Sequence, residues 1–66
     1  MNVIDFIKKY VATTEYIRII KSFSILFEGS VKEFNNMDQF SKNVLLNEEV
    51  SIVAASEDGY LCISCR

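Results

Sequence analysis

The sequence predicts an α+β fold, in which an N-terminal helix packs on a small antiparallel sheet of three or four strands that ends in a C-terminal β-hairpin. Three observations predict this fold: apolar residues at helical spacing in residues 2–12, a two-residue apolar period in residues 16–28, and Asp58-Gly59 between two apolar runs. The chain has 66 residues, of which 50% are hydrophobic, so we expect a single domain over residues 1–66.

Residues 2–12 predict an amphipathic helix, because their apolar residues share one helical face. These residues are Val3, Ile4, Ile7, Tyr10 and Val11. Asn2 is a suitable N-cap, and Asp5 lies near the positive end of the helix dipole. The β-branched pair Thr13-Thr14 disfavours continuation of the helix.

Residues 16–28 have the two-residue period of a strand. The apolar residues of one parity are Ile17, Ile19, Phe23, Ile25 and Phe27. The segment is long for one strand. We therefore expect either a bend near Lys21-Ser22, or a helix that runs through Ile20 and is followed by a strand from Phe23.

The middle of the chain predicts a short strand and a short helix. Gly29 marks a break, and Ser30-Val31-Lys32-Glu33 matches the S-x-x-E pattern of a helix cap but also reads as a strand. We expect the strand, after a Gly-Ser turn. Residues 36–43 predict a short helix, because Met37, Phe40 and Val44 recur at spacings of three and four.

Residues 49–56 and 60–65 flank Glu57-Asp58-Gly59 and predict the hairpin, since Asp-Gly favours a two-residue turn with positive φ. With that loop, Ala55 pairs with Cys62. The core face then consists of Val50, Ile52, Ala54, Leu61, Ile63 and Cys65. A change of one residue in loop length would exchange the two faces.

The opposite face of the hairpin carries four candidate contact residues for a partner or a second subunit: Val53, Ala55, Tyr60 and Cys62. Packing under the N-terminal helix explains the same residues equally well. Phe34, Met37 and Phe40 form a second candidate contact, because aromatic residues ringed by acidic ones are typical of binding hot spots. A helix stripe packed on the sheet is the alternative explanation for these three residues.

The residues that usually perform catalysis are missing. The chain has no histidine and no glycine-rich phosphate loop, so we expect neither an enzyme nor a bound cofactor. Cys62 and Cys65 have C-x-x-C spacing, but residues three apart on a strand point to opposite faces. We therefore interpret them as reduced packing cysteines and expect no metal. A metal or redox site shared across a dimer is the alternative.

Charge and size restrict the partners that we expect. The net charge of −2 argues against nucleic-acid binding, and the net acidic half, residues 33–66, suits a basic protein partner. No uncharged stretch is long enough to span a bilayer, and no signal-peptide pattern occurs, so we expect a cytoplasmic protein. A core this small cannot bury so many apolar residues, which predicts a homo-oligomer, most simply a dimer.

The apolar spacing around Gly29 in Ile25–Phe34, followed by Leu45–Val50 and Gly59–Ile63, resembles that of small uncharacterised accessory proteins of phages and mobile elements of low-GC bacteria. The resemblance covers residues 25–63 and includes no catalytic motif. It implies a small α+β protein, made early in infection, that binds and disables a host factor, including defence proteins, in the cytoplasm of the bacterial host.

These observations favour a non-enzymatic protein-binding module, specifically a phage-type inhibitor of a host defence protein that acts by stoichiometric occlusion. An apolar and acidic surface would cover a basic site on the target. Two alternatives are an oligomer that sequesters a small signalling nucleotide and a structural or regulatory subunit of a larger complex.

Overall fold

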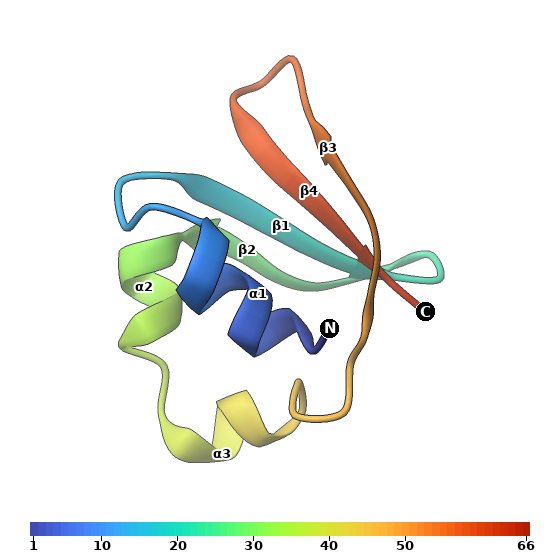
Figure 1. The fold of residues 1–66 in the computed structure, drawn as a ribbon. Coiled ribbons are helices and arrows are strands. Elements are labelled where there is room, and N and C mark those ends of the chain that lie inside the picture. Colours follow the sequence, from blue (N-terminus) through green and yellow to red (C-terminus); the bar gives the residue numbers. More distant parts are fainter.

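The computed structural model covers residues 1–66 and contains three helices and four strands. In chain order they are α1 (Val3–Tyr10), β1 (Tyr16–Lys21), β2 (Ser24–Ser30), α2 (Val31–Asn35), α3 (Gln39–Asn43), β3 (Val50–Ala55) and β4 (Tyr60–Cys65). The expected α+β fold, with its N-terminal helix, four strands and C-terminal hairpin, is confirmed (Figure 1). None of the helices has the length and apolar character needed to cross a membrane.

The four strands form one sheet in the order β2-β1-β4-β3. Two antiparallel hairpins, β1–β2 and β3–β4, make up its halves. They meet at the parallel pair β1–β4, so the sheet is mixed and not antiparallel throughout. The helices α2 and α3 and the strand β3 belong to the connection that brings the chain back to β4. A parallel pair needs such a long crossover.

Asn2 caps α1 as expected, since its side-chain oxygen accepts a hydrogen bond from the Ile4 N–H at 2.9 Å. The N-terminus is also held to the segment that precedes β3. The Val3 N–H donates to the Glu48 carbonyl at 2.9 Å, and the Val50 N–H donates to the Met1 carbonyl at 2.9 Å. These bonds fix α1 against the sheet from its first turn.

The two-residue period of residues 16–28 comes from a hairpin, so the expected bend near Lys21-Ser22 is confirmed and the helical alternative is wrong. Ser22 has a φ of 56° in the turn. A bulge between Ile19 and Ile20 shifts the register, and Ile25 pairs with Ile20. The expected single face is therefore wrong: Ile25 lies on the opposite face from Ile19, and Phe23 is fully exposed in the turn.

The expected strand after Gly29 is wrong, because α2 begins there. Ser30 and Glu33 form a capping box: Ser30 Oγ accepts from the Glu33 N–H at 3.1 Å, and the Glu33 carboxylate accepts from the Ser30 N–H at 3.3 Å. Gly29, the last residue but one of β2, lies in a tight place, since a Cβ there would lie 3.3 Å from the Phe27 ring. The expected helix in residues 36–43 is present as α3, with Asp38 as its N-cap.

The β3–β4 turn has three residues instead of the expected two. The Ser56 N–H donates to the Tyr60 carbonyl at 2.8 Å, and the Gly59 N–H donates to the Ser56 carbonyl at 3.1 Å. Gly59 has a φ of 89°, which suits a three-residue loop that closes on a left-handed glycine. The register therefore differs by one residue from the expected one, and Ala54 pairs with Cys62.

This register exchanges the two faces of β3. Val53 and Ala55 lie on the face of Ile63, whereas Ile52 and Ala54 lie on the face of Tyr60 and Cys62. The expected core positions of Ile52 and Ala54 are wrong, and the expected faces of the β4 residues are confirmed. A difference of one residue is enough to exchange the faces, because successive side chains of a strand point to opposite faces of the sheet.

The three helices all lie on one side of the sheet (Figure 1). The buried core between them consists of Val3, Ile7, Ile17, Ile19, Val31, Phe34, Leu45, Ile63 and Cys65. Phe34 contacts the Phe27 ring edge-on, with ring centroids 5.3 Å apart. No charged or polar residue is buried in this core.

Phe34 and Phe40, both candidate contacts from the sequence, offer a matched test of the core. Phe34 is 2% exposed and Phe40 is 83% exposed. We expect Phe34→Ala to lower the free energy of unfolding by about 3–5 kcal/mol, and Phe40→Ala to change it by less than about 0.5 kcal/mol. Urea unfolding followed by circular dichroism measures both. Equal losses for the two variants would contradict the core described above.

Candidate functional site

The face of the sheet that points away from the helices, here called the open face, has no covering layer (Figure 1). Its side chains form three rows that cross the strands in register. The apolar row contains Ile25, Ile20, Ser64 and Ile52; the charged row contains Glu28, Arg18, Cys62 and Ala54. The tyrosine row contains Tyr16 and Tyr60, which lie opposite each other on β1 and β4.

The apolar row presents isoleucine side chains from three strands to solvent. Ile25 is 57% exposed and Ile52 is 64% exposed, while Ile20 between them is half-buried. Phe23, in the turn that leads into β2, is fully exposed. Single exposed apolar residues are ordinary, but a row that crosses a whole sheet is a contiguous patch. Such a patch is typical of an interaction surface.

Arg18 lies at the centre of the open face and contacts four other residues. Its Nε donates to Glu28, and its Nη2 lies 2.8 Å from Asp58 Oδ2. Its Nη1 donates to Cys62 Sγ at 3.6 Å, and its guanidinium lies 4.6 Å from the centre of the Tyr60 ring. The hydrogen bonds that Arg18 donates to Asp58 and Glu28 raise its already high pKa further. The guanidinium is therefore held as a fixed positive charge between two carboxylates.

Asp58 connects the β3–β4 turn to β1 through its ion pair with Arg18. The hydrogen bond from Arg18 is the main cause that lowers the pKa of Asp58 to about 2, with further hydrogen bonds from Ser56 and the Tyr60 N–H. Arg18 also lies next to Tyr60, whose ring is 5.7 Å from that of Tyr16. The β3–β4 turn, the strand β2 and both central strands thus contribute to one polar cluster.

The charge balance of the open face restricts what can bind there. Arg18 is the only basic residue in the three rows, and Glu28 and Asp58 together outweigh it. An anionic ligand such as a phosphate would meet two carboxylates beside one already-paired guanidinium. The face combines Tyr, Arg and Ile side chains, and tyrosine and arginine are enriched at protein interfaces. Its chemistry therefore suits a protein surface.

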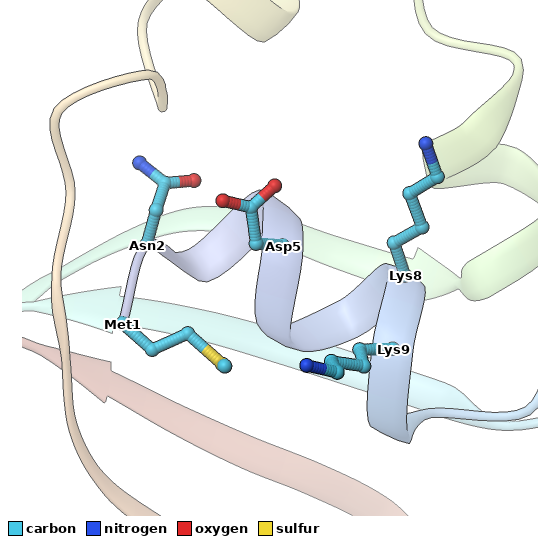
Figure 2. Close-up of a pocket in the computed structure, with 5 residues that line it drawn as sticks. All are labelled: Met1, Asn2, Asp5, Lys8 and Lys9. Carbon is cyan, nitrogen blue, oxygen red and sulfur yellow. The ribbon is translucent and has the colours of Figure 1, made fainter.

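A hollow of about 500 Å³ lies on α1, away from the open face (Figure 2). Its lining consists of Met1, Asn2, Asp5, Lys8 and Lys9. The Lys8 and Lys9 side chains point in different directions, and the Asp5 carboxylate lies between Asn2 and Lys8 (Figure 2). This hollow on a single copy thus offers no converging donors for a phosphate.

The sequence-predicted contact residues do not form one surface. Tyr60 and Cys62 lie on the open face, whereas Val53 and Ala55 lie on the opposite face of β3. Val53 and Ala55 are nevertheless exposed and not packed under α1. In the second set, Phe34 belongs to the core, Met37 is half-buried against it and Phe40 is exposed. The expected hot spot of these three residues is therefore wrong as a single surface.

The sequence reasoning missed Arg18, Tyr16, Ile20, Ile25 and Ile52 as members of the site. The signal for Ile52 was available, because a three-residue loop at Glu57-Asp58-Gly59 places it beside Ser64. Arg18 gave no local signal, since Asp58 is 40 residues away in the chain. Only the pairing of β1 with β4 brings them together.

The two cysteines point to opposite faces, as expected from their spacing. Cys62 lies on the open face and Cys65 is 8% exposed in the core. Burial is the main cause that raises the pKa of the Cys65 thiol; the Glu48 carboxylate adds to this effect and Lys21 opposes it. No group of three or more ligand side chains is positioned to hold a metal ion.

Comparison with known proteins gives no relative: no family model, curated protein or solved structure matches the chain. The chemistry of the open face is therefore the basis for assigning a function.

The contact between Asp58 and Arg18 predicts part of the acid sensitivity of the fold. Because the folded pKa of Asp58 is about 2, below its ordinary value of 3.8, its stabilising contribution is present above pH 4 and is lost as the pH falls toward 2. We expect Asp58→Asn to flatten the dependence of unfolding free energy on pH in this window, measured by urea unfolding. The neighbouring variant Glu57→Gln should keep the wild-type slope, and a wild-type slope in Asp58→Asn would contradict the assignment.

The cysteines should differ in reactivity with a thiol reagent. In the native protein we expect Cys62 to be modified first, because Cys65 is buried and its thiol pKa is raised. Tandem mass spectrometry can locate the modification, and Cys62→Ser should abolish fast labelling. Equally fast labelling of both thiols in the folded state would show that Cys65 is accessible.

Proposed function

We propose that the protein is a non-enzymatic binding module that attaches to a partner protein through the open face. The observation that carries this proposal is the apolar row, which crosses all four strands and leaves Ile25 and Ile52 more than half exposed. Fully burying an isoleucine side chain stabilises a complex by roughly 1.5–3 kcal/mol. A partner that covers the row would gain part of this free energy at each position.

The size of the open face indicates how far such an interface extends. Four strands of about six residues present a projected area of roughly 400 Å², given the usual strand spacing and rise. A typical specific interface buries roughly 800 Å² on each partner. The turns at both ends of the sheet are therefore expected to contribute, and they carry Phe23 and Glu57.

The charges at the open face favour a partner with basic groups around an apolar patch. Glu28 and Asp58 exceed Arg18 by one charge, and the whole chain has a net charge of −2. Complementary charges accelerate association and make it sensitive to salt. Because Arg18 is fixed by four contacts before binding, little conformational freedom is lost there.

Occlusion is the simplest mechanism for a module of this kind. A protein without catalytic groups alters its partner by covering a functional surface in a stoichiometric complex. Inhibition of a host protein, which the resemblance to phage accessory proteins implies, is one form of this mechanism. Assembly as a structural subunit would use the same face and differs in leaving the activity of the partner intact.

Ile25→Asp tests the open face, because it places a carboxylate in the apolar row at an exposed position. Val44→Asp is a matched control: Val44 is 65% exposed and follows α3, on the helical side of the sheet. Proteins captured from bacterial lysate by the wild type would be purified and titrated with all three chains by calorimetry. We expect a 1:1 complex that Ile25→Asp weakens at least about tenfold and Val44→Asp leaves unchanged.

The titration also separates the possible outcomes. A partner that binds Ile25→Asp and the wild type equally uses a different surface, which contradicts the assignment to the open face. Circular dichroism of the variant shows whether the sheet is intact, so loss of folding is not mistaken for loss of binding.

A further inference from the structure

β3 is an edge strand that lacks most of the features that keep edge strands from pairing. It has β4 on one side and no strand on the other. Residues 51–55 are uncharged, contain no proline and are all exposed. Soluble monomers usually protect such an edge with charges, prolines or bulges. Here the one protective feature is a bulge between Val50 and Ile52, at the start of the strand.

The hydrogen-bonding groups on this edge can be identified from the turn. The Ser56 N–H bonds to Tyr60, so Ser56 faces β4. Because the backbone groups of an antiparallel strand alternate in direction, those of Ala54 also face β4, and those of Val53 and Ala55 face outward. The outward edge ends near Val50, whose N–H already bonds to Met1.

We propose that two copies of the chain pair antiparallel along β3, with Ala54 on the two-fold axis. In this register Val53 of each copy exchanges two backbone hydrogen bonds with Ala55 of the other, so all four outward groups on each copy are paired. The paired segments carry no charge, and Ile52 and Val53, which are 64% and 37% exposed in one copy, become more buried.

The bulge at the start of β3 distinguishes this register from its neighbour. A two-fold axis at Val53 would pair Ala55 of one copy with Ser51 of the other, but Ser51 is the extra residue of the bulge. Beyond Ser51 the edge is already occupied, because Glu49 forms a bridge with Asn2 of the same copy. With the axis at Ala54, the bonded residues are Val53 and Ala55, which lie on the regular part of the strand.

The dimer would be one continuous sheet of eight strands. Its two-fold axis is perpendicular to the sheet, so both open faces lie on the same side and their projected area doubles. This inference rests on the edge of β3 and goes beyond the proposed function, which concerns the face. A monomeric protein would overturn the dimer and leave binding through the open face untouched.

Charged side chains introduced at position 54 test the pairing. In the dimer the two charges would lie next to each other at the two-fold axis, whereas in a single copy position 54 is exposed. Sedimentation equilibrium should show a dimer for the wild type and monomers for Ala54→Lys and Ala54→Glu, with the dissociation constant raised at least about 100-fold. Mixing the two variants should restore a 1:1 heterodimer, which also proves that both are folded. Ile25→Lys, on the other edge strand, should remain dimeric.

Amide hydrogen exchange, read by NMR, identifies the edge directly. The Val53 and Ala55 amides should be protected in the wild-type dimer and exchange rapidly in Ala54→Lys. A dimer held by its open faces would leave these two amides unprotected. That result, a monomeric wild type, or variants that remain dimeric when measured alone would overturn the proposal.

Discussion

The parallel pairing of β1 with β4 is the contact on which the rest of the structure depends. It places Ile17 beside Leu61 and Ile19 beside Ile63, and three of these four side chains are completely buried. It joins the first third of the chain to its last residues, so it closes the fold. The other strand of each hairpin, β2 or β3, then lies at an edge of the sheet, which gives the order β2-β1-β4-β3.

The helices are sufficient to cover only one face of this sheet. α1 has eight residues, and α2 and α3 have five each. Helices of this length are not stable alone in water, so their caps and their contacts with the sheet hold them. With every helix used on one side, the opposite face is left uncovered (Figure 1). The shortage of helices therefore produces the open face, whereas the strand order produces the free edge of β3.

The open face owes its chemistry to this arrangement. Arg18 would be an isolated charge on an apolar surface if β1 were not flanked by strands and a turn that carry acids. The pairing with β2 supplies Glu28, and the pairing with β4 brings Asp58 within 2.8 Å. Fixing the guanidinium in this way leaves a surface that is apolar along one row and slightly acidic along the next.

The C-terminal hairpin shows how much of the structure can be predicted from local sequence patterns. Asp58-Gly59 correctly predicted a turn and the two strands around it, and the buried face of β4 followed from alternation. The loop length did not follow, because one additional residue closes equally well on a left-handed glycine. That single residue decided which face of β3 holds Ile52. The bulge at Ile19 had the same effect on Ile25.

The sequence by itself determined the elements whose causes are local: the helix that Asn2 caps, the position of the C-terminal turn and the alternating core face of β4. It also showed that side chains typical of catalysis are scarce, because the composition of a chain does not depend on its fold. The tertiary structure alone decided the strand order, the face that stays open and the partners of Arg18. These depend on contacts between residues far apart in the chain, and no local preference or spacing encodes which distant strand will become a neighbour.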